Sequence, residues 1–184
     1  MKSRVYQLSS VASPGNQSDT ANVHYTRYTV KRLTADQLAD ALDFATGTRE
    51  KYQGLSLGTR AIQLPDTKVR SFLLDVFGRP ARQITCECDR TMQPNIAQAM
   101  HLLNGDFLNK KIEAPAGRIE ELVKANKPLP AAIEDLYLAT LCRPPKEAEL
   151  SKAQEAIKAA PSAKEGLQDL LWVLLNSREF LFNH

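Results

Sequence analysis

The sequence predicts a mainly α-helical fold, with about seven or eight helices in an irregular bundle. Apolar residues recur at helical spacing in several segments, and typical helix start and stop residues bound those segments. The last fifty residues contain three closely spaced helical segments, separated by Pro144-Pro145 and by Pro161. The N-terminal half is rich in loop residues, so we expect it to hold at most short extended segments.

Length and composition limit the class of protein. A chain of 184 residues suffices for one compact domain with an irregular arm. Its charged fraction of 24% is ordinary for a soluble globular protein, and its net charge of +3 is spread over interspersed acids and bases. That charge is too weak to indicate nucleic acid as a partner. No apolar run approaches the roughly 18 residues of a membrane span, so no membrane insertion is expected.

The first thirty residues are predicted to form an irregular arm, and residues 31–184 a single helical domain. Ser, Asn, Gln and Thr dominate the arm, with a turn signal at Pro14-Gly15. Residues 23–30 alternate loosely and include β-branched and aromatic side chains, which favours a short extended segment. Residues 1–15 carry early cations but no sustained apolar core, so a signal peptide is not expected there.

The first helix is the most clearly bounded one. Thr34 and Gln37 match a capping box, and Gly47 is a natural stop. Residues 48–68 are predicted to be irregular, with a second short extended piece at 59–64. A helix is expected over 69–77, ended by Gly78, and a polar connector over 79–93.

The second half is predicted to be helical with short connections. Pro94 suits the first turn of a helix that ends near Asn104, and Ser162 with Glu165 forms a second capping box. The remaining helices are expected over residues 107–112, 116–125, 130–141, 146–160, 162–176 and 178–182.

Trp172 lies in the most apolar segment of the chain, Leu170 to Leu175. A helix that is apolar almost all round is normally buried on several sides, which predicts a core role, with Tyr137 and Phe180 as neighbours. The functional alternative is a groove for a partner or an aromatic platform for a sugar. The run Arg143-Pro144-Pro145 is interpreted as a helix stop, and a proline-rich ligand is the alternative.

Cys86 and Cys88 are the sharpest local feature, and three interpretations remain open. The pair is structural, as buried thiols or a bracing disulfide. Alternatively it is a strained, easily reduced redox pair, or it supplies two thiolates to zinc with His101 or Cys142. Zinc needs about four ligands, and this spacing does not match a usual finger, so the structural interpretation is preferred.

Several blocks in order resemble a known family. They are Arg32–Ala41, Arg60–Asp66, Phe77–Pro80, Cys86–Arg90, Gln98–Asn104, Leu136–Pro145 and Leu170–Phe180. Together they resemble the C-terminal part of a domain of unknown function abundant in planctomycetes, which closes large exported chains that sometimes carry cytochrome-c-like modules. The resemblance implies a fragment of an exported multidomain protein, located outside the cytoplasm or in the periplasm. It supplies no catalytic residues, because the family has no established activity.

The sequence therefore favours a non-catalytic structural or protein-interaction module, whose partners are other domains of a parent chain or a separate protein. No cofactor is expected, and an enzymatic role is disfavoured. The alternative is a thiol-redox or metal-linked component that uses Cys86 and Cys88. An exposed apolar patch would support the interaction role.

Overall fold

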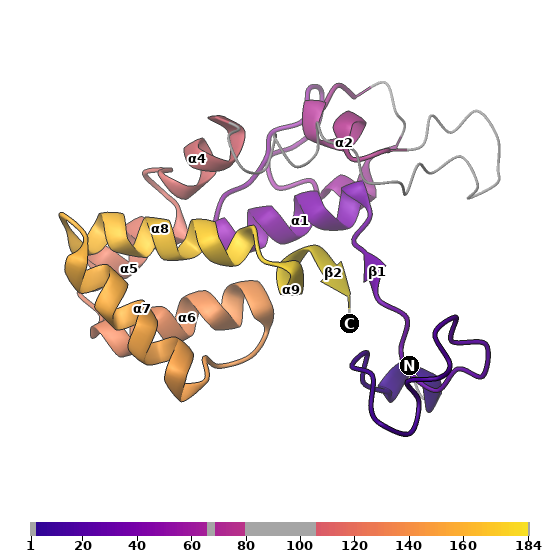
Figure 1. Ribbon diagram of the computed structural model, residues 1–184. Coiled ribbons are helices and arrows are strands. Elements are labelled where there is room, and N and C mark those ends of the chain that lie inside the picture. Colours follow the sequence, from indigo (N-terminus) through magenta and orange to yellow (C-terminus); the bar gives the residue numbers. More distant parts are fainter. Residues whose placement is uncertain (1–2, 66–68, 80–105, 184) are drawn as a thin grey trace.

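A computed structural model of the chain describes residues 3–65, 69–79 and 106–183 (Figure 1). Within these ranges the fold is mainly α, as predicted, with eight α-helices and one two-stranded sheet. The described elements are η1 (Val5–Gln7, a 3₁₀ turn), β1 (Lys31–Arg32), α1 (Ala35–Thr46), η2 (Ala61–Gln63, also 3₁₀), α2 (Phe72–Val76), α4 (Asp106–Ile112), α5 (Arg118–Lys124), α6 (Leu129–Leu141), α7 (Glu147–Ala159), α8 (Ala163–Leu175), α9 (Arg178–Leu181) and β2 (Phe182–Asn183).

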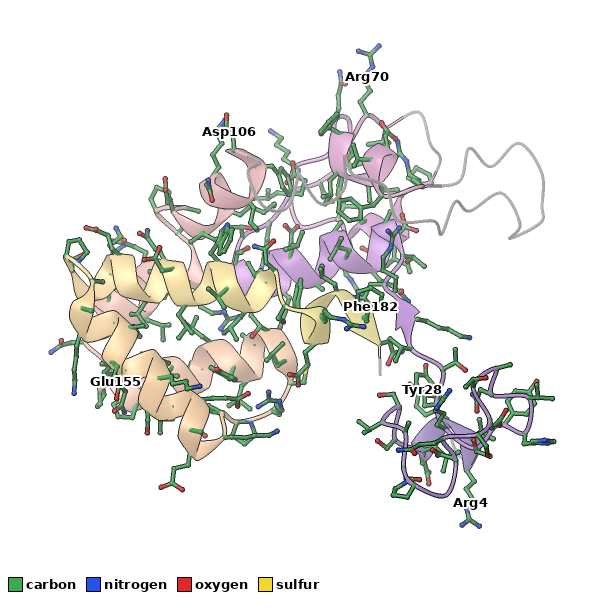
Figure 2. The ribbon with its side chains drawn as sticks, in the orientation of Figure 1. Arg4, Tyr28, Arg70, Asp106, Glu155 and Phe182 are labelled. Atoms are coloured by element: carbon green, nitrogen blue, oxygen red, sulfur yellow. The ribbon has the colours of Figure 1, made fainter. Side chains whose placement is uncertain are left out.

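Two helices organise the packing. α1 contacts η2, α2, α4, α5 and α6, and α8 contacts α4, α5, α6, α7 and α9. In Figure 1 these two helices cross the middle of the molecule, and the other helices lie around them. Polar side chains such as Arg70, before α2, and Glu155, on α7, point away from this body in Figure 2.

The start of α1 forms as its sequence predicts. The Gln37 backbone N–H donates to Thr34 Oγ1 at 3.4 Å, and the Thr34 N–H donates to Gln37 Oε1 at 3.0 Å, which completes the capping box. Gly47 ends the helix with φ 71°, a left-handed conformation that suits glycine. Leu38 and Leu42 lie on the buried face of the helix.

The predicted N-terminal cap of α8 is present, but its second hydrogen bond differs from that of the α1 capping box. Ser162 Oγ accepts from the Glu165 N–H at 3.2 Å, and the Ser162 hydroxyl donates to Glu165 Oε1 at 3.0 Å. Gly166, one turn into α8, lies against α7: a Cβ built there would stand 2.8 Å from Ile157 Cα. The missing side chain therefore sets the close approach of these two helices.

The apolar segment around Trp172 is only partly a core element. Leu171, Leu174 and Leu175 are buried, and Trp172 is half-buried against the core. Val173, however, is 55% exposed, so the expected burial on several sides is wrong for this side of α8. Packing partners of α8 cover the leucine face and leave Val173 open.

The sheet joins the two ends of the helical body. β1 pairs antiparallel with β2, with Arg32 opposite Phe182, and the Leu33 N–H donates to the Leu181 carbonyl at 3.1 Å. The two predicted extended segments are wrong. Residues 23–30 are irregular, and residues 59–64 contain the 3₁₀ turn η2.

Side-chain hydrogen bonds explain the irregular conformation of the arm. Asp19 accepts the N–H groups of Val23 and His24, at 2.8 and 3.1 Å, and Asn22 Nδ2 donates to the Arg27 carbonyl at 2.8 Å. Such local bonds compete with a strand ladder. In Figure 1 the arm forms a lobe apart from the helices, and Figure 2 shows Tyr28 within it.

None of the helices in the described ranges combines the length and apolar character of a bilayer span.

Candidate interaction groove

The cysteine pair singled out by the sequence is not tested, because Cys86 and Cys88, like His101, lie outside the described residues. Cys142 is described, and it is an exposed free thiol at the C-terminal end of α6. The described residues bring together no group of three or more His, Cys, Asp or Glu side chains that could hold a metal. The thiol interpretations therefore stay predictions.

A groove of about 890 Å³ lies along α1, from Gln37 to Gly47. Three parts of the chain build it: one face of α1, the segment from Gly47 to Ile62, and Arg118 at the start of α5. Helical spacing places Gln37, Ala41 and Phe44 on that face of α1. The lining residues are Gln37, Asp40, Ala41, Asp43, Phe44, Gly47, Thr48, Arg49, Gly58, Thr59, Arg60, Ile62 and Arg118.

Two large apolar side chains of the groove face solvent. Phe44 is 67% exposed and Ile62 is 52% exposed. Single exposed apolar residues are ordinary on a protein surface, but here two of them line one hollow. Covering these two side chains with another apolar group removes apolar surface from water, which is favourable.

Both carboxylates of the groove are already bonded within the chain. Asp40 Oδ1 accepts the Ala61 N–H at 2.6 Å, and its Oδ2 lies 3.3 Å from Arg60 Nε. These bonds hold η2 against α1. Asp43 Oδ2 accepts the Glu50 N–H at 2.8 Å, and Lys111 Nζ donates to its Oδ1 at 2.5 Å.

Arg118 is held in place by the end of α1. Its Nε donates to the Ala45 carbonyl at 2.7 Å and its Nη2 to the Phe44 carbonyl at 2.8 Å. These carbonyls belong to the last turn of α1, where a cation is favoured by the helix dipole. The guanidinium also lies over the Phe44 ring, 5.6 Å from its centroid. The cation and the exposed ring therefore form one pre-positioned pair.

Arg49 and Arg60 add two exposed cations to the groove. The Arg60 side chain is 65% exposed although its Nε contacts Asp40. Arg49 has no ion-pair partner among the described residues. The groove thus presents guanidinium N–H donors to solvent, while its carboxylate oxygens are bonded within the chain.

Behind the groove lies a buried polar cluster that fixes its wall. Lys111 from α4 is 8% exposed and reaches both Asp43 and Glu50, the latter at 2.9 Å. Burial, and then the negative charge of Asp43 and Glu50, raise the pKa of Tyr52 well above its usual range. Tyr52 therefore stays a neutral phenol in the core.

The polar groups of the lining are carboxylates, guanidinium groups, an amide and hydroxyls. The lining holds no His or Cys that would act as a base or a thiol nucleophile. Its two hydroxyls have local partners: Thr48 Oγ1 lies 2.8 Å from Thr46 Oγ1, and Thr59 Oγ1 donates to the Ser56 carbonyl at 2.8 Å. The arrangement offers exposed apolar surface and guanidinium groups.

Local sequence patterns offer little sign of this groove. Residues 48–68 are predicted to be irregular, and Phe44 is not among the residues that the sequence pattern singles out. The available signal was the aromatic side chain on a polar helix face, followed closely by Arg49 and Arg60. Arg118 is 74 residues from Phe44 in sequence, so only the fold brings it to the site.

A second polar cluster joins the chain after α6 to α7 and α9. Arg143, after α6, binds Glu149 of α7 at 2.8 and 2.9 Å, and Glu179 of α9 at 2.6 and 2.8 Å. The hydrogen bonds from Arg143 lower the pKa of Glu149 to about 2. The predicted helix stop at Arg143-Pro144-Pro145 is confirmed. Arg143 also connects α7 to α9 through its bonds to Glu149 and Glu179.

Comparison with known proteins gives a family but no close relative. Neither curated proteins nor solved structures give a match to this chain. One family model, PSD1, described as a protein of unknown function (DUF1553), matches residues 1–157. That range includes the arm, α1 and every lining residue of the groove, and it ends within α7. The resemblance to a domain of unknown function is thus confirmed, and the chain belongs to the PSD1 (DUF1553) family.

Proposed function

We propose that this chain is a non-catalytic protein-interaction module that docks a polypeptide segment in the groove along α1. One observation carries the proposal: the groove exposes Phe44 and Ile62 beside three arginines, while both of its carboxylates are bonded within the chain. The partner is a further domain of a parent chain or a separate protein.

The composition of the groove supports a protein ligand. Aromatic and arginine side chains are enriched in protein interfaces, and they dominate the residues whose truncation costs most binding energy. Phe44 and Arg118 are held against each other before any partner arrives. A pre-positioned pair loses less side-chain entropy on binding than two mobile side chains.

The cellular setting rests on sequence resemblance alone. The ordered blocks from Arg32 to Phe180 resemble a domain that closes large exported chains, which supports a location outside the cytoplasm. The thiol-redox or metal-linked alternative has no described residue in its favour, because Cys86 and Cys88 lie outside the described ranges. Thiol titration with and without reductant, together with metal analysis, tests that alternative.

Selection from a displayed library of random peptides tests the docking role. We expect peptides that bind the chain and that lose about tenfold in affinity for a Phe44→Ala/Ile62→Ala variant. Both side chains are exposed, so the variant should fold, as circular dichroism can check. The matched control is Val173→Ala, an equally exposed apolar residue on α8 that does not line the groove. The proposal is overturned if no peptide is enriched, or if the enriched peptides bind both variants like the unaltered chain.

A further inference from the structure

We infer that the segment docked in this groove is acidic: it carries Asp or Glu side chains beside a large apolar one. The apolar side chain covers Phe44 and Ile62, and the carboxylates meet the arginines of the rim. This inference rests on the proposed docking function and adds the chemistry of the partner.

The charge of the lining supports an anionic partner. The lining contains three arginines and two carboxylates. The two carboxylates already accept hydrogen bonds from the Ala61 and Glu50 backbone N–H groups. A basic partner would have to share Asp40 with η2 or Asp43 with Lys111. An acidic partner breaks none of these bonds and finds guanidinium groups open to solvent.

The hydrogen-bonding capacity of the arginines supports carboxylates in particular. Arg118 uses Nε and Nη2 for the carbonyls that end α1, and its Nη1 has no hydrogen-bond partner among the described residues. Arg60 contacts Asp40 through Nε and leaves most of its side chain exposed. Guanidinium groups bind carboxylates through paired N–H donors, and such charge-assisted bonds are about twice as strong as neutral ones.

The arm of a second copy of this chain is a poor occupant of the groove. Among the described residues, the arm lies apart from the helices in Figure 1, and it exposes Val23 and Tyr25. Its charged side chains are Lys2, Arg4, Asp19 and Arg27, and the Asp19 oxygens bind Val23, His24 and Thr26 within the arm. The arm therefore brings apolar side chains but no available carboxylate to the arginines.

A nucleic acid fits less well than an acidic peptide. Phosphate backbones are recognised by extended basic stripes, whereas this groove holds three arginines around exposed apolar side chains. Phe44 and Ile62 would gain little from a phosphate backbone. A single-stranded oligonucleotide therefore serves as the competing probe in the test.

The experiment uses the peptides selected from the random library and derivatives with every Asp and Glu replaced by Asn and Gln. On the unaltered chain we expect the amide derivatives to bind about tenfold more weakly, since two or more charge-assisted contacts are lost. On an Arg49→Gln/Arg60→Gln variant, which keeps Arg118, the difference in affinity between the acidic and amide forms should shrink, which is the pattern of a coupled pair in a double-mutant cycle. Both arginines are exposed, so the variant should fold.

The matched control is Arg70→Gln, because Arg70 is exposed and points away from the helical body in Figure 2. It should keep the full difference between acidic and amide peptides. If amide derivatives bind the groove as tightly as acidic ones, the inference is overturned while the docking function stands. If the oligonucleotide binds more tightly than the peptides and displaces them, the acidic-segment inference is overturned as well. Absence of any groove-binding peptide would instead remove the docking function itself.

Discussion

At the scale of single residues, Lys111 shows how one buried cation positions the wall of the groove. Its Nζ reaches Asp43, Glu50 and Thr48, the last at 3.4 Å, and it lies 4.9 Å from the centroid of the Phe107 ring. A buried charge is tolerated only when it is paired, so each partner restrains the others. α4, the end of α1 and the segment after it are thus fixed together.

We predict that Lys111→Met destabilises the chain by roughly 3 kcal/mol, because it leaves two carboxylates without their cation in a largely buried place. Glu50 is partly exposed, so we expect a loss of stability at the lower end of the range for broken buried ion pairs. Urea unfolding measures the effect. Its control is Lys110→Met at the neighbouring exposed position, which should stay within about 0.5 kcal/mol of the unaltered chain. Equal effects of the two variants would contradict a structural role for Lys111.

The lowered pKa of Glu149 predicts that the stability of the chain depends on pH in the acidic range. Its folded pKa of about 2 lies below the ordinary value of 4.5, because Arg143 and the Lys146 N–H bond its ionised form. The contribution of such a group to stability is complete above pH 4.5 and is lost as the pH falls through about 2. We therefore expect Glu149→Gln to flatten the fall of the melting temperature across this window.

The control for this titration is Glu147→Gln, an exposed carboxylate in the same first turn of α7. It should leave the acid dependence close to that of the unaltered chain. Thermal melts over a series of acidic buffers give the comparison. A Glu149→Gln variant with the same acid slope as the unaltered chain would show that Arg143 does not hold this carboxylate in solution.

At the scale of elements, the contact between α7 and α8 depends on the absence of a side chain at Gly166. A Cβ there would approach the Cα and Cγ2 atoms of Ile157 to 2.8 and 2.9 Å, and both atoms lie in a packed helix. We predict that Gly166→Ala destabilises the protein by up to about 2 kcal/mol. Overpacking usually costs about 1–3 kcal/mol, and the helix preference of alanine over glycine offsets roughly 1 kcal/mol of it.

The same substitution at Gly15 is the matched control, because no atom lies within 4 Å of a Cβ built there. Chemical unfolding of the two variants should separate them clearly. If Gly166→Ala is as stable as the unaltered chain, α7 and α8 can move apart without loss. The close helix contact would then not contribute to stability.

The helices themselves were predictable from local sequence, because caps and apolar spacing act within a few residues. The Thr34 cap, the Gly47 stop and the α6–α7 break at Pro144 are all confirmed. Helix ends shifted by a few residues, as for the helix expected over 69–77, which is Phe72–Val76 in the structure. Local pattern fixes the type of element better than its limits.

What the sequence did not reveal depends on contacts between distant residues. The segment 59–64 has an extended pattern, but Asp40 binds the N–H of Ala61 and η2 forms instead. Val173 looks like a core residue, yet no described helix covers its side of α8. The groove depends on the contact between Arg118 and Phe44, and no local sequence pattern predicts that contact. The role of Cys86 and Cys88 stays a prediction.

At the scale of the whole molecule, the described residues of the arm and those of the helical body form separate sets of hydrogen bonds. The hydrogen bonds of the described arm residues end within the arm itself, as when the Tyr28 N–H donates to the Ser9 carbonyl at 3.1 Å. Tyr6 and Tyr28 stack edge to face within the arm, with centroids 5.8 Å apart. From Lys31 onward the chain pairs with β2 and enters α1 through the Thr34 cap.

We therefore predict that removal of residues 1–30 leaves the helical body folded, with a melting temperature within about 2 °C of the full chain and unchanged peptide affinity at the groove. Removal of residues 1–34 also deletes β1 and the Thr34 cap. Loss of a helix cap alone costs about 1 kcal/mol, so this deletion should lower the melting temperature by a further 2–4 °C or more. Calorimetry of the two truncated chains distinguishes them. If the shorter deletion is already as harmful as the longer one, the arm contributes to the core, and the boundary at residue 30 is wrong.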